Sequence, residues 1–208
     1  VLSKLLGIPM VISHHGLRSR GRRFLRLKEW LIGRVNIHWA NVILLPSHAA
    51  KQELDRLGAA DQKFHVVYHG IDTERFVPVV SKGVTPFTLL FGGRLEPSKG
   101  LIYLIEAMKI LVGQGLEIRL KIVGNGSESD NLKNLCVQYS LHEHIQFLGF
   151  VEDDELPAIY ATSDLFVHPS LFEENRFTEV FGLVLAEAMA CGTPVLSTRN
   201  GGLQEVVL

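Results

Sequence analysis

Two glutamates eight positions apart lie at the start and in the middle of an apolar run near the end of the sequence. Glu179 precedes the run, and Glu187 is the only charged residue from position 180 to position 192. The apolar positions cover nearly the whole circumference of the predicted helix, so we expect this helix to be mostly buried. A buried carboxylate costs on the order of several kcal/mol unless it is paired or accepts hydrogen bonds. Glu187 therefore pairs with an internal arginine, accepts bonds from backbone donors, or accepts bonds from ligand hydroxyls.

Glu179 stands immediately before the same predicted helix. A carboxylate at a helix start is favoured by the helix dipole, by about 0.3–1 kcal/mol, which is a purely structural explanation for this residue. The functional alternative is a ligand contact made from a loop at the edge of a sheet.

The stretch FGGRLEPSKG combines two glycines with two cations. Gly92 and Gly93 end a predicted strand and let backbone amides approach a ligand closely. Arg94 and Lys99 bracket a turn that leads into a helix beginning near Lys99. Two cations beside a helix N-terminus suit an anion, above all a diphosphate, whereas the structural alternative is a pair of exposed loop cations.

The stretch GNGSES contains Gly124 and Gly126 and is superficially similar to a phosphate-binding loop. It departs from the G-x-G-x-x-G pattern at Ser129 and lacks the lysine of a Walker motif. We therefore expect a tight turn that lines a pocket rather than a dinucleotide fingerprint.

His14 and His15 follow a short predicted strand and precede a glycine. A histidine at the carboxyl end of a strand can face a cleft, and the alternative is one structural and one exposed histidine. The sequence contains no H-E-x-x-H or G-x-S-x-G pattern, so it indicates neither a zinc-protease site nor the serine nucleophile of a hydrolase.

Short β-branched runs alternate with helical patterns along the chain, which is typical of an α/β fold with a parallel sheet. Strands are predicted at 10–13, 41–46, 64–70, 87–93, 116–124, 144–151, 164–170 and 193–202. Helices are predicted at 22–38, 47–58, 99–115, 128–140, 154–163 and 180–192, with Ser47 as the N-cap of the second. Residues 71–86 read as an interdomain linker. In open sheets ligands bind beyond the carboxyl ends of the strands, where the stretches described above are expected to meet.

The bulk composition bounds the class of protein. The chain has 208 residues, 47% of them hydrophobic, and a formal charge of -1, which argues against recruitment of nucleic acid by a global field. Cys136 and Cys191 form no C-x-x-C motif and indicate a reducing compartment. We see no membrane span or signal peptide, and we expect a fragment of a longer cytoplasmic protein. Six basic residues at 18–28 form either a solvated helix face or a peripheral contact with a membrane surface, at the inner membrane face.

Taken in order, these motifs resemble the retaining glycosyltransferases of family 4, the glycosyl transferases group 1, which have the two-domain GT-B fold. The resemblance rests on GGRL, KG, VGNG, FLGFV, DLFVHPS, the pair of glutamates and GGLQEVV, and on LGIPMVISHHG and YHGIDTERFVP in the first part. It implies two Rossmann-type, doubly wound parallel-sheet domains, both incomplete here. Residues 1–78 would be the C-terminal part of the N-terminal (acceptor) domain, and 79–208 a C-terminal (donor) domain truncated at its end.

The resemblance also implies a function, namely transfer of a sugar from a nucleotide-diphosphate donor to an acceptor hydroxyl with retention of configuration. Arg94 and Lys99 would neutralise the departing diphosphate, and Glu187 would bind the ribose hydroxyls. The remaining implied contacts are Glu179 with the amides around Phe181 and Gly182 for the donor sugar and phosphate, His15 across the cleft for the donor sugar, and backbone near Phe150 for the base. Together with Gly92, Gly93, Gly124 and Gly126 these residues make up the predicted site.

The resemblance implies no metal and no cofactor other than the nucleotide-sugar substrate, and a saccharide or lipid-linked acceptor. The chain departs from the family pattern in the lengthened stretch PSLFEENRFTEVFG, where Glu173 and Glu174 compete with Glu179 for the first acidic role. Val180 and His69 also replace more usual residue types. Two alternatives remain: a nucleotide-sugar epimerase of the same fold, and a non-catalytic fragment that binds a nucleotide-sugar.

Overall fold

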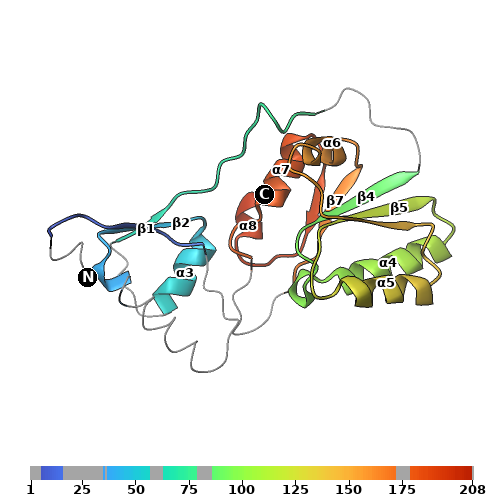
Figure 1. Cartoon of the computed structure of the whole chain (residues 1–208), viewed down its shortest axis with the longest axis horizontal. Coiled ribbons are helices and arrows are strands. Elements are labelled where there is room, and N and C mark those ends of the chain that lie inside the picture. The colour runs from blue at the N-terminus through green and yellow to red at the C-terminus, as the bar shows by residue number, and fades with distance from the viewer. Residues whose placement is uncertain are drawn as a thin grey trace.

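The computed structural model describes residues 6–15, 35, 37–56, 63–78, 86–171 and 179–207. The basic stretch 18–28, most of the predicted helix 22–38, and both Glu173 and Glu174 lie outside these residues. In the described part the chain forms two separate parallel sheets, of three and five strands (Figure 1). The three-stranded sheet has the order β1-β2-β3, where β1 is Val11–Ser13, β2 is Val42–Leu45 and β3 is Phe64–Val66. The helix α3, His48–Arg56, packs against β2 and β3.

The five-stranded sheet has the order β6-β5-β4-β7-β8, and every neighbouring pair is parallel. Its strands are β4 Phe87–Gly92, β5 Ile118–Val123, β6 Ile145–Gly149, β7 Leu165–His168 and β8 Val195–Ser197. The chain starts at the central strand β4, moves outward to β6, and then returns to β7 on the other side of β4. The strand order therefore reverses between β4 and β7, which is where doubly wound sheets bind their ligands.

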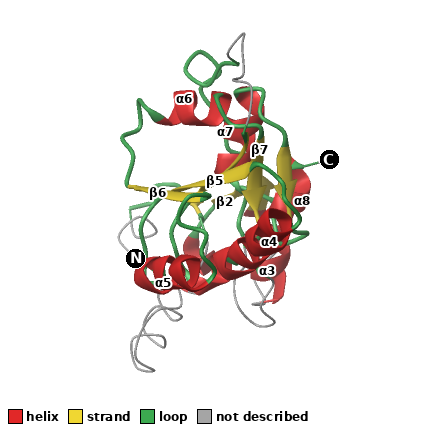
Figure 2. Ribbon diagram, turned by 90° about the vertical axis from the view of Figure 1, so that its right-hand side faces the viewer, coloured by secondary structure: helices red, strands yellow, loops and turns green. Residues whose placement is uncertain are grey.

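Helices cover both faces of this sheet (Figure 2). On one face lie α4, Leu101–Gly113, and α5, Ser129–Gln138; on the other lie α6, Leu156–Ala161, and α7, Leu183–Ala190. The short helix α8, Leu203–Val206, packs next to α7. Adjacent residues of β4 alternate between the two cores, with Phe91 in the first and Leu90 in the second. A sheet buried on both faces explains why its strands read as continuous apolar runs.

The boundaries of two predicted helices differ from the observed ones. The helix α4 begins at Leu101 rather than near Lys99, because Pro97–Lys99 form a 3-10 turn and Gly100 adopts a left-handed conformation with φ +68°. A Cβ atom at Gly100 would lie 2.1 Å from the carbonyl oxygen of Pro169, so the turn needs glycine for its packing as well. This contact joins the loop after β4 to the loop after β7.

The expectation that the helix after Glu179 is mostly buried is wrong. It runs only over Leu183–Ala190, and its fully buried residues are Leu185 and Ala188. Leu183 and Met189 are 38% and 39% exposed. The helix covers the sheet with one face, so its uniformly apolar sequence overstates its burial.

The first part of the predicted linker 71–86 packs against the second core. Phe76 is 6% exposed, and its ring lies 6.1 Å from that of Tyr160 in α6. The Arg75 guanidinium lies over the Phe76 ring and donates a hydrogen bond to the carbonyl oxygen of Asp153. The domain boundary at 78/79 stays a prediction.

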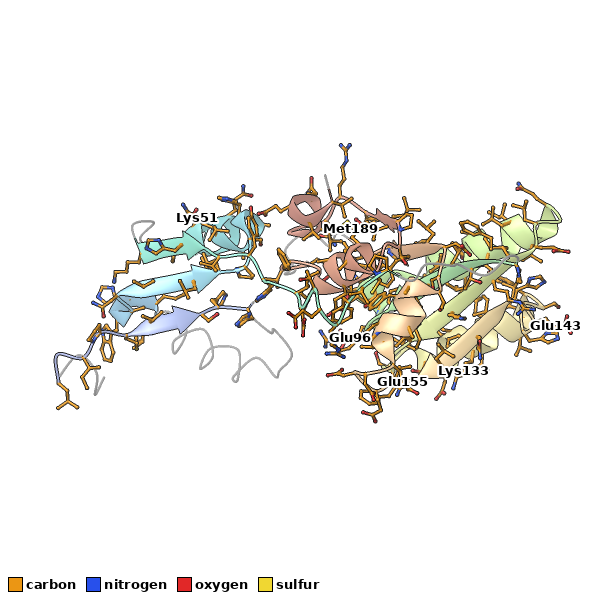
Figure 3. All side chains as sticks on the ribbon, turned by 90° about the horizontal axis from the view of Figure 1, so that it is seen from above. Lys51, Glu96, Lys133, Glu143, Glu155 and Met189 are labelled. Atoms are coloured by element: carbon orange, nitrogen blue, oxygen red, sulfur yellow. The ribbon has the colours of Figure 1, made fainter. Side chains whose placement is uncertain are left out.

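The carboxyl ends of the five strands point toward the three-stranded sheet. In Figure 3, Glu96, which follows β4, lies at the end of the five-stranded unit nearer that sheet, whereas Glu143, which precedes β6, lies at the opposite end. Cys136 and Cys191 belong to cores on opposite faces of the sheet, so they are not bonded to each other. Within the described ranges, no helix has the length and apolar character needed to cross a bilayer.

Candidate functional site

Two charged side chains meet beyond the carboxyl ends of β4 and β7. Lys99, in the turn that follows β4, donates through Nζ to Oε1 of Glu179, which lies 80 positions later in the chain and shortly before α7. Each of these side chains is only 15% exposed. The strand order creates this pair, because it places the loops after β4 and β7 next to each other.

Glu179 receives three donors on a single oxygen. Besides Lys99, the hydroxyl of Ser170 lies 2.8 Å from Oε1, and Nε2 of His168 lies 3.3 Å from it. Burial by itself would raise the pKa of Glu179, but the hydrogen bond from His168 and the charge of Lys99 outweigh it and hold the pKa well below its usual range. Glu179 is therefore a firmly ionised carboxylate.

His168 is a member of this cluster that sequence reasoning missed. It ends β7, is 2% exposed, and its ring lies parallel to those of Phe91 and Phe166, at centroid distances of 5.8 Å and 6.2 Å. Its Nδ1 atom is buried and has no hydrogen-bond partner among the described residues. An unsatisfied buried polar atom of this kind costs about 1–3 kcal/mol. The available signal was a histidine in the otherwise apolar strand LFVH.

Asn200, after β8, is a second missed residue. It is 1% exposed, and its side-chain amide donates to the carbonyl oxygen of Leu171 at 2.7 Å and approaches Ser170 Oγ at 3.5 Å. Its Oδ1 atom is the other buried side-chain atom without a partner in the described part of the chain. One unsatisfied atom thus belongs to a donor of Glu179, and the other to a residue that contacts Ser170 and Leu171.

Glu187, on α7, has a different environment. Its Oε2 accepts a hydrogen bond of 2.9 Å from the hydroxyl of Tyr160, whose side chain belongs to α6. Burial raises the pKa of Glu187, while the bond from Tyr160 and the positive charge of Arg75 partly oppose the increase. The partner is therefore a phenol, and neither an internal arginine nor a backbone donor bonds this carboxylate among the described residues.

A small apolar pocket lies beside this hydroxyl. It is lined by Leu90, Gly92, Val123, Leu156, Ile159 and Tyr160. A Cβ atom at Gly92 would lie 3.6 Å from the Tyr160 hydroxyl, so the predicted glycine loop and Glu187 approach the same side chain.

The predicted glycines after β5 allow two loops to pack backbone to backbone. A Cβ atom at Gly124 would lie 2.0 Å from the carbonyl oxygen of Gly93, and one at Gly126 would lie 2.2 Å from that of Leu95. The amide of Leu95 also donates to the carbonyl oxygen of Asn125 at 3.0 Å. The loops after β4 and β5 therefore form one layer at the edge of the sheet.

His15, from the three-stranded sheet, connects to the start of α7 through a chain of aromatic rings. Its ring stacks on that of His69 at 5.1 Å, and His69 meets Phe181 edge-on at 5.3 Å. Phe181 directly precedes Gly182, the N-cap of α7. Burial and the charge of His15 lower the pKa of His69. The predicted residues His15, Phe181 and Gly182 thus lie along one path between the two sheets.

A second junction between the sheets involves Glu205 of α8, which was not predicted. Its carboxylate accepts bonds from the amides of His48 and Ala49 at 2.8 Å each, and from the Tyr68 hydroxyl at 3.1 Å. A carboxylate on α8, which packs next to α7, thereby accepts the unpaired amide hydrogens at the start of α3, which packs on the three-stranded sheet.

The structure confirms the predicted role of Ser47 as the N-cap of α3. Its Oγ accepts the amide hydrogen of Ala50 at 3.0 Å, as an N-cap does. The hydroxyl also donates to the carbonyl oxygen of Val180 at 2.5 Å, two residues before the N-cap of α7. The N-cap thus joins the two sheets as well.

The remaining predicted residues are more exposed. The Arg94 side chain is 56% exposed and forms an ion pair of 2.8 Å with Glu96, so it is far more accessible than Lys99. Phe150 follows β6 and is 71% exposed. No group of three or more His, Cys, Asp or Glu side chains in the described part of the chain is arranged to hold a metal ion.

Comparison with known proteins gives the class. Residues 72–208 match the family of glycosyl transferases group 1, and residues 1–75 match glycosyltransferase family 4. An uncharacterized glycosyltransferase of Methanocaldococcus jannaschii is 43% identical over 57% of this chain and 29% of its own length. The D-inositol 3-phosphate glycosyltransferase of Pseudarthrobacter chlorophenolicus is 31% identical over 99% of this chain and 52% of its own length.

Among solved structures, the HepE protein of Anabaena in complex with UDP and glucose is similar in structure, and the likeness covers 99% of this chain and 57% of the HepE chain. The TM-score is 0.80 at 24% sequence identity, so this likeness concerns the fold. The chain belongs to the glycosyl transferases group 1 family, and its α/β fold of parallel sheets is GT-B-like, as predicted. It spans 29% and 52% of the two relatives named above.

Proposed function

We propose that this chain takes part in transferring a sugar from a nucleotide-diphosphate donor to an acceptor hydroxyl with retention of configuration. The observation that carries the proposal is the Lys99–Glu179 pair beyond the carboxyl ends of β4 and β7, at the point where the strand order reverses. Membership of the glycosyl transferases group 1 family supports the same reaction class. So does the binding of UDP and glucose by a protein of similar fold.

In the proposed reaction, cations stabilise the charge that develops on the leaving diphosphate. Arg94 is exposed and can turn from Glu96 to a ligand, whereas Lys99 is already held by Glu179. Electrostatic stabilisation by preorganised groups is commonly the largest catalytic contribution, and a lysine fixed before substrate binds loses little freedom. The proposal needs no metal ion or cofactor.

The donor's other parts meet the remaining predicted residues. Glu187 accepts the ribose hydroxyls with the lone pairs that Tyr160 leaves unused. The start of α7 at Phe181 and Gly182 offers backbone amides to a phosphate, and the backbone near Phe150 meets the base. His15 contacts the donor sugar from the other sheet.

Retention follows in this proposal from attack on the same face of the sugar that the diphosphate leaves. The bond from C1 to the phosphate oxygen breaks, the acceptor oxygen bonds to C1, and the acceptor proton passes to the leaving phosphate. The acceptor is a saccharide or a lipid-linked acceptor, and the basic stretch 18–28 is the proposed contact with an anionic membrane surface.

Calorimetry with UDP-, GDP- and ADP-sugars tests the donor site. We expect Arg94→Ala, Lys99→Ala and Glu187→Ala each to weaken binding of the preferred donor about tenfold, roughly 1.4 kcal/mol. Arg119→Ala is the matched control for Arg94→Ala, because Arg119 is exposed near the amino end of β5. Variants that bind like the parent contradict the site. Analysis of the reaction products tests the activity. Donor binding without transfer or hydrolysis indicates the non-catalytic alternative, and a product with inverted anomeric configuration contradicts retention.

A further inference from the structure

We infer that His168 is a positioning residue for the proposed donor site: it fixes the carboxylate of Glu179 through Oε1 and leaves Oε2 for a hydroxyl group of the donor sugar. The inference rests on the proposed function and adds a residue that lies in the stretch DLFVHPS but received no role from the sequence. It also assigns the two oxygens of Glu179 different roles.

The ring of His168 has little freedom to turn. It is 2% exposed and is parallel to the Phe91 and Phe166 rings within 2° and 11°. A ring held flat in this way presents its Nε2–H in one direction, toward Glu179 Oε1 at 3.3 Å. The position of the carboxylate is therefore tied to the central strands of the sheet rather than to a flexible side chain.

The three described residues that donate to Glu179 converge on one oxygen. Lys99, His168 and Ser170 each contact Oε1, and no described residue donates to Oε2. A carboxylate oxygen that already accepts three bonds has no lone pair left, whereas its neighbour keeps its full capacity to accept. Oε2 is thus the atom of Glu179 that can receive a hydroxyl from a sugar.

A stabilising role alone does not explain a histidine at this position. A phenylalanine would fill the same flat space without burying the partnerless Nδ1. The other unsatisfied buried atom in the described part, Asn200 Oδ1, belongs to the residue that holds Ser170 and Leu171. One unsatisfied atom therefore belongs to a donor of Glu179, and the other belongs to a residue that contacts a second donor, Ser170. Polar satisfaction is incomplete at these two positions, as is common where a functional geometry is imposed.

Two substitutions distinguish the hydrogen-bonding role of the His168 N–H from the packing role of its ring. His168→Phe keeps a flat ring between its neighbours and removes the N–H, while His168→Gln restores an N–H donor of similar reach. The probes are UDP, GDP and ADP, each compared by calorimetry with UDP-glucose, GDP-mannose or ADP-glucose, using the pair that the wild-type chain binds most tightly. Thermal melting of each variant reports on folding.

We expect His168→Phe to bind the nucleoside diphosphate within about twofold of wild type and the sugar conjugate about tenfold more weakly. His168→Gln should recover most of the lost affinity for the conjugate. A His168→Phe variant that melts like wild type and binds the conjugate equally well overturns the inference. Equal losses for the diphosphate and the conjugate also overturn it, because they indicate general damage to the site.

If His168→Phe fails to fold, Ser170→Ala provides the second test, since it removes another donor to Oε1 and leaves the histidine ring in place. A loss confined to the sugar conjugate, of about threefold, supports the inference, and no such selective loss overturns it. Failure of the proposed function looks different. In that case the wild-type chain binds neither the diphosphates nor their sugar conjugates, and the assignment of His168 falls with it.

Discussion

Glu179 and Glu187 are the same type of residue, lie eight positions apart around the start of α7, and have pKa values shifted in opposite directions. Burial by itself would raise the pKa of both carboxyl groups. At Glu179 the hydrogen bond from His168 and the charge of Lys99 more than compensate, whereas among the described residues Glu187 has one hydrogen-bond donor, the neutral hydroxyl of Tyr160. The partners, and not the degree of burial alone, therefore decide whether a half-buried glutamate is held as an anion.

This difference suits two tasks. Glu179 is a fixed counter-ion that orients Lys99 through Oε1, and no described residue donates to its other oxygen, Oε2. Glu187 retains lone pairs that no described residue uses, which is the state expected of a carboxylate that waits for ligand hydroxyls. The comparison can be tested on each side.

The largest effect is expected at the ion pair. Glu179→Gln should lower the free energy of unfolding by about 3 kcal/mol, because it leaves a mostly buried Lys99 without its counter-charge. Lys99→Met should cost less, because Glu179 keeps His168 and Ser170. The double variant Lys99→Met/Glu179→Gln should lose less free energy of unfolding than the two single variants lose in total. Urea unfolding measures all three losses. Strict additivity would show that the pair contributes no coupling.

The pH dependence of stability should differ between the two carboxylates. Because the folded-state pKa of Glu179 lies below the ordinary glutamate value of 4.5, its contribution is fully present above that value and is lost as the pH falls toward the folded pKa. Thermal melting of Glu179→Gln should therefore depend less on pH below 4.5 than that of wild type. Parallel curves for the two proteins would contradict the lowered pKa.

Glu187 should behave in the opposite sense. Its folded-state pKa is raised, so the charged form opposes folding above that pKa, and this penalty disappears as the pH falls to the ordinary value of 4.5. Glu187→Gln keeps an oxygen for the Tyr160 hydroxyl and removes the charge. It should melt slightly higher than wild type at pH 7, with a gain that shrinks toward pH 4.5. A destabilised Glu187→Gln would argue that the charge has a structural partner.

Tyr160→Phe addresses the single donor of Glu187. Removing the hydroxyl should raise the pKa of Glu187 further and lower the free energy of unfolding by about 1 kcal/mol, the usual contribution of one hydrogen bond. Tyr103→Phe serves as the control, because Tyr103 is 56% exposed on α4. Chemical denaturation measures both variants, and equal stabilities would assign the Glu187–Tyr160 bond no net contribution.

The smallest change in stability is expected at Arg94. Its ion pair with Glu96 is largely exposed on the arginine side, and such pairs contribute about 0–1 kcal/mol. Arg94→Ala should therefore melt close to wild type while weakening donor binding. If Arg94→Ala destabilised the chain as much as Lys99→Met, the contrast between a buried and an exposed cation would be wrong.

Much of the layout followed from local patterns. The alternation of apolar runs predicted every strand of both sheets within a few residues, and Ser47 was predicted as the N-cap that it is. The extent of the helix after Glu179 was wrong, because an apolar sequence records which residues tolerate burial and not which face the sheet covers. The start of α4 was misplaced because the left-handed Gly100 is set by its contact with Pro169.

The sequence by itself determined which residues stand at the carboxyl ends of strands, and so which cations, glycines and carboxylates are candidates for a site. Only the tertiary structure decided their partners: Lys99 with Glu179 across 80 positions, Tyr160 with Glu187 across 27, and Glu205 with the start of α3 across 157. Such pairings depend on strand order and on how the crossovers place distant loops together. Local periodicity carries no information about that order, because each segment satisfies its own pattern in any arrangement of the sheet.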